Sequence, residues 1–329
     1  MANNGLTNAE LVSFLDLPSD IITKLQTEQG DTWTATANQF LTALYNKVLY
    51  QTVSSMDFAN PFKKYDSFPI NFGDTVENIF VELPKGYTFN KDATDPFTKV
   101  APSVKTLYAS INYELQYETT VQDSLLRRAC LSEYGFMNLI DTIVGSLAKS
   151  MSLDEYSATI AMLNNADIYA NGFESVTRGS TDSETASIIT KKIVNTVSHM
   201  KLPEKTNNKI GITQTSKPED LLLVIKADLL DSINLDYLEG VYNLSKVDLL
   251  KNIIPVGSFQ VEDTDGTKKG EDIDFVIVDT KGFDNHVALQ DGGMIYNPKG
   301  KYTNHFYNLW KIVSYKYFYN ARAFKLADA

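Results

Sequence analysis

Cysteine and histidine are scarce in this sequence. Among 329 residues, Cys130 is the only cysteine, and His199, His286 and His305 are the only histidines. A single cysteine cannot form an internal disulfide, so nothing supports a disulfide-stabilised secreted domain. No histidine has a second metal-type ligand at helical spacing, and we therefore expect no metal site. We interpret Cys130, which lies in an amphipathic stretch, as a buried and inert thiol.

The sequence also lacks long apolar runs and an excess of basic residues. No window approaches the roughly 18 apolar residues of a membrane span, and the first residues, Met-Ala-Asn-Asn-Gly, do not resemble a signal peptide. Lys and Arg number 30 against 41 Asp and Glu, which gives a net charge of -11. Sequence-independent binding of DNA needs clustered Lys and Arg that displace counterions, so this balance argues against it.

Sequence patterns of known catalytic sites are missing. There is no Gly-x-Ser-x-Gly and no phosphate-binding Gly-rich loop. The segment Asp263–Gly266 resembles part of a calcium loop, but position twelve is Asp274 rather than Glu, and a hairpin turn is favoured. Asp279 follows an apolar run, as in aspartyl-phosphate enzymes, but Lys281 stands where those enzymes need a second Asp. One enzymatic alternative stays open, a cytoplasmic α/β enzyme with a site around Asp279 and His286.

What the sequence does contain is an aromatic-rich final stretch. Residues 302–329 hold nine aromatic side chains in 28 positions, against 11% overall. From Leu309 to Ala323 apolar residues occupy alternate positions, and Lys311 is the one charge on that face. This spacing predicts a strand with one buried face. Because the run exceeds fifteen residues, we expect it to cross between subdomains or to follow a subunit edge.

The first part of the chain changes character near residue 60. Residues 1–60 predict a helical arm, with a capping pattern at Thr7 and Glu10. Residues 61–118 hold half of the chain's ten prolines and three strand-like runs, at 68–72, 77–83 and 104–117. The two runs that flank Pro84–Pro102 predict a long hairpin. A two-stranded ribbon is marginally stable alone, so it needs a surface to lie on, and a neighbouring subunit would serve.

The second part predicts a long helix followed by an α/β unit. A helical apolar pattern runs from Thr120 to about Tyr169. Thr181 and Glu184 predict the start of a further helix. Short apolar runs suited to buried strands follow within residues 201–300, at 221–225, 253–256 and 274–278. A chain of this length usually divides into two packed subdomains.

The order of these parts resembles the Hong Kong 97-type capsid fold of tailed phages. Eight stretches are similar to the major capsid proteins of phi29-like podoviruses, in the same order and over roughly residues 50–326. They are Asn60–Lys64, Pro69–Ile79, Val104–Leu107, Thr120–Leu125, Asp154–Tyr156, Leu223–Leu229, Asn297–Tyr302 and the aromatic run Trp310–Phe324. The phi29 pattern includes an immunoglobulin-like domain in some relatives, which we do not expect here, so no surface-attachment role is carried over.

The resemblance implies an α+β fold of five parts. These are an N-terminal arm (1–60), an extended E-loop hairpin with its flanking strands (61–118), a peripheral domain with a long spine helix (119–205), an α/β axial domain (206–302), and a return strand to the peripheral domain (303–329).

The resemblance also implies a structural function: a major capsid protein that self-assembles into the icosahedral or prolate shell around the double-stranded DNA of a tailed phage. Copies of the chain would form pentamers and hexamers. Its other partners would be a scaffolding protein and a portal at one vertex. It would be located in the host cytoplasm during assembly and then in the virion. It implies no catalytic, cofactor-binding or metal residues, no membrane and no sequence-specific DNA binding. Besides the enzyme, a tail or connector component that forms a ring of fixed number remains an alternative.

Overall fold

A computed structural model describes residues 12–13, 15–28, 32–40, 43, 59–71, 73–86, 88, 101–122, 133–230, 252–262 and 267–327. The chain divides into two compact units: unit 1 comprises Met1–Asn60, Tyr113–Tyr156 and Val287–Lys311, and unit 2 comprises Pro61–Asn112, Ser157–His286 and Ile312–Ala329. The capping pattern at Thr7, the thiol of Cys130 and the turn at Asp263–Gly266 lie outside the described residues. No described helix is long and apolar enough to cross a membrane.

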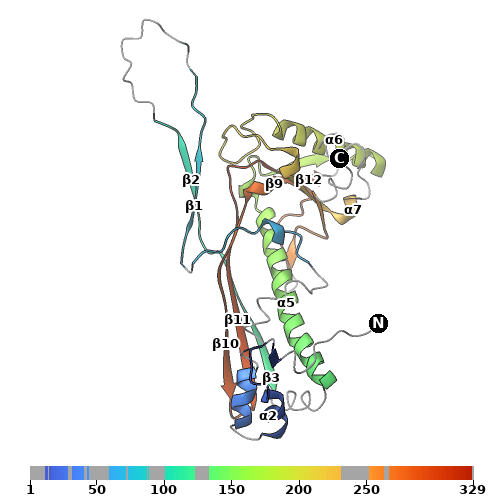
Figure 1. Cartoon of the computed structure of the whole chain (residues 1–329). Helices are drawn as coiled ribbons and strands as arrows, with labels where there is room; N and C mark the ends of the chain where they lie inside the picture. The colour runs from blue at the N-terminus through green and yellow to red at the C-terminus, as the bar shows by residue number, and fades with distance from the viewer. Residues whose placement is uncertain are drawn as a thin grey trace. The chain divides into compact units, whose positions relative to one another are not determined.

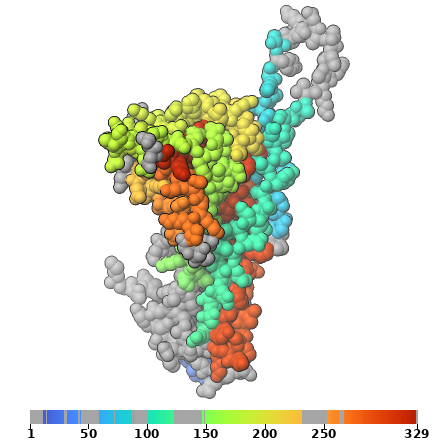
Figure 2. Space-filling model, turned by 180° about the vertical axis from the view of Figure 1, so that it is seen from behind, coloured from blue at the N-terminus to red at the C-terminus, as the bar shows by residue number. Residues whose placement is uncertain are grey.

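Unit 1 is built on a three-stranded sheet in the order β10-β11-β3. Strand β11 (Tyr302–Tyr315) pairs antiparallel with β3 (Tyr113–Gln122), from Tyr302 opposite Gln122 to Lys311 opposite Tyr113. In Figure 2 the teal β3 runs beside the orange-red strands. Strand β10 spans Phe283–Asn297. Every second residue of β11 from Thr303 to Tyr315 is buried. The predicted alternation is therefore confirmed from Leu309 to Tyr315, but it ends there, because Tyr317 and Tyr319 are only half-buried.

The one charge on the buried face of β11 has a partner on the long helix α5 (Glu133–Leu163). Lys311 Nζ lies 2.9 Å from Glu155 Oε1, and the two side chains are 3% and 9% exposed. A lysine is tolerated at this position because a buried charge that is paired avoids most of the cost of desolvation.

Helices predicted within residues 1–60 are present where the structure describes them. Helix α2 (Ile21–Thr27) buries Ile21 and Leu25, and a second helical stretch covers residues 32–40. The two are joined by the Trp33 indole, whose Nε1 donates to the Leu25 carbonyl oxygen at 2.9 Å. Thr303 of β11 donates to Asn38 Oδ1 at 3.2 Å, so this helical segment contacts the sheet of unit 1.

Unit 2 is built on a mixed five-stranded sheet in the order β4-β12-β9-β5-β6. The outer pairs β4·β12 and β5·β6 are parallel, whereas β12·β9 and β9·β5 are antiparallel. The three predicted apolar strands are confirmed as β5, β6 and β9. The strands are β4 (Phe173–Thr177), β5 (Leu221–Lys226), β6 (Ile253–Val256), β9 (Phe275–Asp279) and β12 (Ala321–Ala327).

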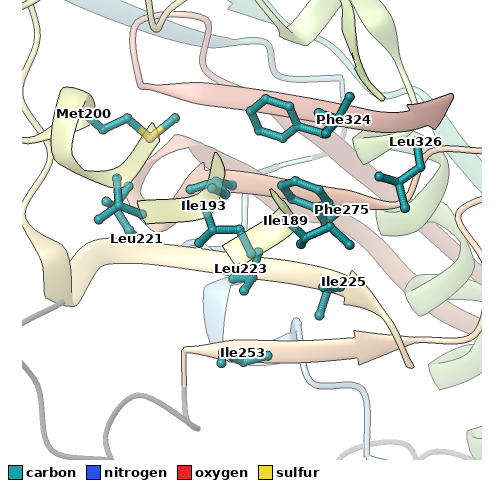
Figure 3. Close-up of a cluster of buried hydrophobic side chains, with 13 residues drawn as sticks. Ile189, Ile193, Met200, Leu221, Leu223, Ile225, Ile253, Phe275, Phe324 and Leu326 are labelled. Atoms are coloured by element: carbon teal, nitrogen blue, oxygen red, sulfur yellow. The ribbon is translucent and has the colours of Figure 1, made fainter. Parts of the chain in front are cut away.

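Helix α6 (Asp182–Met200) packs on this sheet and forms the core of unit 2 (Figure 3). Its Ile189, Ile193, Val197 and Met200 meet apolar side chains of β5, β9 and β12 in one buried cluster. The predicted capping pattern is confirmed, because Thr181 Oγ1 accepts from the Glu184 backbone N–H at 3.2 Å.

The remaining described elements are short, apart from a hairpin described below. They are the helix α7 (Ala227–Leu230), the 3-10 helices η2 (Lys63–Tyr65), η3 (Ala166–Ile168), η4 (Pro218–Asp220) and η5 (Thr280–Gly282), and the strands β7 (Val261–Glu262) and β8 (Lys268–Lys269).

Two predictions of long strands were wrong because tertiary hydrogen bonds interrupt each run. The stretch 104–117 breaks at residues 110–112, where Asn112 Nδ2 donates to the Val313 carbonyl and Asn112 Oδ1 accepts from the Val313 N–H, both at 2.9 Å. The final run is likewise split into β11 and β12 by a turn at 316–320, where the Tyr315 hydroxyl donates to the Asn320 carbonyl at 2.9 Å.

Other local predictions also needed correction. The long helix does not begin at Thr120, which lies in β3 and donates to Asn304 Oδ1 of β11 at 2.7 Å. It ends at Leu163 rather than near Tyr169, because a 3-10 turn follows and the Tyr169 hydroxyl donates back to the Leu163 carbonyl at 2.5 Å. The run 68–72 is no strand in its described part; only Asp66 forms an isolated bridge, with Asn285.

Candidate interaction surface

The feature of unit 2 with the clearest functional meaning is a hairpin of β1 (Val76–Val81) and β2 (Val104–Ala109). The strands pair antiparallel from Val76 opposite Ala109 to Val81 opposite Val104, which confirms the predicted hairpin. This two-stranded sheet stands apart from the five-stranded sheet of the same unit (Figure 1). Its two faces differ in what they contact.

One face of the hairpin exposes apolar side chains to solvent. Ile79, Val81, Val104 and Tyr108 are 59%, 56%, 47% and 69% exposed, and we call these four residues the hairpin face. Val81 and Val104 are directly opposite, and Ile79 is diagonal to both Val104 and Tyr108. Two polar residues share this face: Thr106 lies opposite Ile79, and Glu77 accepts from the Tyr108 hydroxyl at 2.8 Å. Leu83 follows at 84% exposed. Contiguous exposed apolar side chains of this kind mark interaction surfaces.

The opposite face holds the hairpin on the rest of unit 2. The Phe80 ring stacks on Phe318 with centroids 5.5 Å apart. Asn78 Nδ2 donates to Asp284 Oδ2 at 2.6 Å. The hairpin is therefore anchored at its root, next to a cavity of about 240 Å³ lined by Asn78, Asp284, Lys316 and other residues of unit 2.

Asp284 is the centre of this anchor and is 1% exposed. Its Oδ1 lies 3.1 Å from His286 Nε2 and 3.2 Å from Lys316 Nζ. His286 Nδ1 in turn lies 2.7 Å from the carbonyl oxygen of Phe68. Sequence reasoning missed Asp284 and Lys316 as partners because 32 positions separate them; three consecutive polar residues at the start of β10 (Asp284 to His286) were the available signal.

The enzymatic alternative rested on Asp279 and His286. In the structure both side chains are buried and form hydrogen bonds that hold neighbouring segments of the fold together. Asp279 accepts from Ser216 Oγ at 2.6 Å and from the Lys281 N–H at 3.0 Å, and burial raises the pKa of its carboxyl. Its side chain thus caps the turn η5. Among the described residues Asp279 and His286 share no hydrogen-bond partner, and the cavity beside the hairpin is lined by neither.

The other histidines lie in contrasting places. His199 is in the last turn of α6, and its Nδ1 lies 2.8 Å from Glu204 Oε1. His286 and His305 lie within β10 and β11, each a few residues after the start of its strand. Burial lowers the pKa of His305 to about 4, so its ring is neutral near pH 7. Within the described ranges, no three His, Cys, Asp or Glu side chains gather as metal ligands would.

This arrangement of a long helix, a projecting hairpin and a mixed sheet is the Hong Kong 97-like fold of phage capsid proteins. A chain in the capsid structure of Staphylococcus phage Andhra superposes with a TM-score of 0.63 and 13% identity, covering 84% of this chain and 86% of that one. A chain in the mature capsid of bacteriophage PhiM1 gives a TM-score of 0.58 and 10% identity, covering 83% and 89%. The predicted α+β capsid fold is confirmed.

The chain belongs to the Phi29-like phage major capsid protein family, whose model matches residues 20–325. It is 29% identical over 298 residues to the major capsid protein of Bacillus phage B103, covering 88% of this chain and 64% of that protein. It is 26% identical over 308 residues to that of Streptococcus phage Cp-1, covering 89% and 84%. The chain thus spans less than two thirds of the length of the Bacillus relative.

Proposed function

We propose that this chain is the shell-forming subunit of a tailed phage. Many copies self-assemble, as pentamers and hexamers, into the icosahedral or prolate shell that encloses the packaged double-stranded DNA. The observation that carries the proposal is the hairpin face, an apolar surface that no described part of the chain covers, in a member of a capsid protein family. The role is structural, without catalysis, cofactor or metal.

In this proposal the five parts of the chain keep distinct tasks. Residues 1–60 form the N-terminal arm, and residues 61–118 form the extended hairpin and its flanking strands. The peripheral domain (119–205) and the axial domain (206–302) supply the rigid body, to which residues 303–329 return. The partners are further copies, a scaffolding protein and a portal at one vertex. The chain works in the host cytoplasm during assembly and afterwards in the virion.

The hairpin face supplies cohesion through burial of apolar surface. Full burial of a Val, Ile or aromatic side chain contributes about 1.5–3 kcal/mol. The four side chains are about half exposed, so covering each one contributes about 1 kcal/mol. Several kcal/mol per hairpin, repeated for every copy, accumulate in a closed shell. The net charge of -11 fits a container whose walls do not adhere to DNA.

Electron microscopy of the purified chain tests the proposal, with and without co-expressed scaffolding protein. Shells or capsomer rings are expected for the wild type, and Val81→Asp should reduce them strongly by placing a charge in the hairpin face. Leu202→Asp is the matched control, since Leu202 is 52% exposed but lies outside the hairpin. Monomers that persist with scaffolding protein would contradict the proposal, and rings of one fixed size without shells would favour a connector.

A further inference from the structure

Strand β10 forms one edge of the three-stranded sheet of unit 1 (Figure 1). Near its start the side away from β11 is occupied, because Asp66 bridges Asn285 and the Ser67 amide donates to the Asn285 carbonyl oxygen at 2.8 Å. Further along, β11 is the only described strand that pairs with β10. The outer side of residues 287–297, which we call the β10 edge, therefore presents backbone N–H and C=O groups to which another strand can bind.

The chain protects its other sheet edges by means that natural proteins commonly use. In the five-stranded sheet, the edge strand β6 has four residues and includes Pro255, which has no N–H to donate, and the edge strand β4 has five residues. In the sheet of unit 1, the opposite edge strand β3 exposes Glu114 and Glu118. Short length, proline and charge all disfavour pairing with another chain.

The β10 edge has none of these protections. The strand has fifteen residues, and positions 290–295 are exposed without interruption and read Gln-Asp-Gly-Gly-Met-Ile. Their one charge, Asp291, accepts from Asn308 Nδ2 of the neighbouring strand at 3.0 Å. Nothing lies within 4 Å of a Cβ added at Gly293, and Ile295 is 66% exposed. A long, accessible and nearly uncharged edge of this kind is one that pairs with a further strand.

The residues of this edge are complementary to a second copy of themselves. In a symmetric antiparallel pair, one residue lies opposite its own copy on a two-fold axis. With Gly292 on the axis, Ile295 lies opposite Leu289. Asp291 then lies opposite Gly293, so apolar side chains meet and no carboxylate is directly opposite another. Because each chain carries a net charge of -11, copies repel one another on average, and a segment with a single carboxylate favours their approach.

We propose that the β10 edges of two copies pair antiparallel about a two-fold axis at Gly292. The pairing joins two three-stranded sheets into one continuous sheet, and each copy supplies the same residues. The contact is separate from the hairpin face, which lies on β1 and β2. Its meaning for a particle rests on the proposed shell function: a two-fold contact closes on itself, so it joins two subunits without extending into a filament.

Single-cysteine variants test the position of the axis. Cys130→Ser removes the one native cysteine, and Gly292→Cys is introduced in that background. Gly292 does not have a positive φ, so cysteine fits its backbone. Residues opposite each other in an antiparallel pair have Cα atoms about 4.5–5.5 Å apart, a separation that a disulfide spans. The purified variants are oxidised at low protein concentration, alone and after co-expression with scaffolding protein, and dimers are measured on non-reducing gels.

The matched control is Glu118→Cys in the same background, because Glu118 is exposed on the other edge of the same sheet. We expect Gly292→Cys to form dimers at least about tenfold faster than Glu118→Cys, since pairing raises the effective concentration of the two thiols. Leu289→Cys and Ile295→Cys test the antiparallel direction. Each should cross-link slowly with itself, whereas a mixture in which one variant carries an affinity tag should give the heterodimer.

A charge placed on the β10 edge tests whether strand pairing causes the cross-link. Ile295→Lys, added to Gly292→Cys, should lower the rate of dimer formation to that of Glu118→Cys. Leu153→Lys is the control for this change, because Leu153 is an apolar side chain of α5 in the same unit and is 53% exposed. It should leave the rate of Gly292→Cys unchanged.

The cysteine variants decide the proposal even if Ile295→Lys folds poorly. Equal rates for Gly292→Cys and Glu118→Cys in both preparations would overturn it, because the cross-links would then report random collision. A heterodimer of Leu289→Cys and Ile295→Cys that forms no faster than either homodimer would also overturn it. Rapid dimer formation by Gly292→Cys without any shell would leave the paired edge in place and count against the proposed function alone.

Discussion

Lys311 Nζ and Glu155 Oε1 are 2.9 Å apart in a place that is almost closed to water. The pair joins β11 to α5 within unit 1, so it fixes the long helix against the sheet. Removing one partner of a buried pair leaves an uncompensated charge, which typically costs about 3–5 kcal/mol. Removing both and filling the volume with apolar atoms costs far less.

The first prediction concerns this pair. Lys311→Met should lower the free energy of unfolding by about 3 kcal/mol or more, and adding Glu155→Met should restore most of that loss. Urea unfolding of the wild type, both single variants and the double variant gives the coupling energy. Strictly additive effects of the two substitutions would contradict the assigned pairing.

The second prediction concerns His305 and pH. Burial lowers the pKa of His305 to about 4 from 6.5, so the unfolded chain binds a proton more readily than the folded chain between these values. Above pH 6.5 the ring is neutral in both states and does not oppose folding. As pH falls from 6.5 toward 4, the unfolded chain takes up the proton first, so the free energy of unfolding decreases. From pH 7 to pH 4.5 we expect a loss of about 2–3 kcal/mol from this group. Urea unfolding of the wild type and of His305→Gln at pH 7 and at pH 4.5 isolates the contribution of His305, because the variant lacks the titrating ring.

The third prediction concerns the close approach of Gly282 to a buried aromatic ring. A Cβ added at Gly282 would come within 2.1 Å of Tyr315 Cζ, whereas nothing lies within 4 Å of a Cβ added at Gly257. Tyr315 cannot move aside, since its hydroxyl bonds both Asp279 and Asn320. Gly282→Ala should therefore destabilise unit 2 by about 1–3 kcal/mol or more. Gly257→Ala, the matched control, should change thermal stability little, and equal shifts in the two variants would exclude a steric cause.

The fourth prediction concerns the start of α6. The Thr181 hydroxyl accepts from the Glu184 N–H, and the Glu184 carboxylate accepts from the Ser180 N–H at 2.9 Å. Thr181→Ala should cost about 1 kcal/mol in the free energy of unfolding, whereas Thr181→Ser should retain the cap. Chemical unfolding followed by circular dichroism measures both variants. If Thr181→Ser were as unstable as Thr181→Ala, the capping hydroxyl would not be the source of the stabilisation.

The sequence predicted elements whose signal is local. The apolar runs of β5, β6 and β9 and the alternation of β11 each reflect burial on a regular period, so they can be read without knowing the partner strand. The hairpin was predictable for the same reason, since two alternating runs flank a Pro-rich turn. Even Lys311 stood out, as the single charge on an apolar face.

What the sequence could not predict depends on contacts between distant segments. Nothing near Asn112 indicates that its amide substitutes for a backbone partner of Val313, although that contact ends one strand and begins another. The contacts that hold the root of the β1–β2 hairpin could not be predicted either, because Asn78, Asp284 and Lys316 become neighbours only through the fold. The apolar pattern favoured helix from Thr120 onward, but pairing with β11 keeps this residue in a strand.

The position of β12 in its sheet has a consequence for synthesis. Residues 321–327 lie between β4 and β9, so two strands that are made much earlier have no contact through this sheet until β12 is inserted. The sheet can close only after those residues have left the ribosome. Chains interrupted before that point lack β12 and leave the facing edges of β4 and β9 unpaired, so we expect such truncated chains to aggregate rather than to reach the folded state of unit 2.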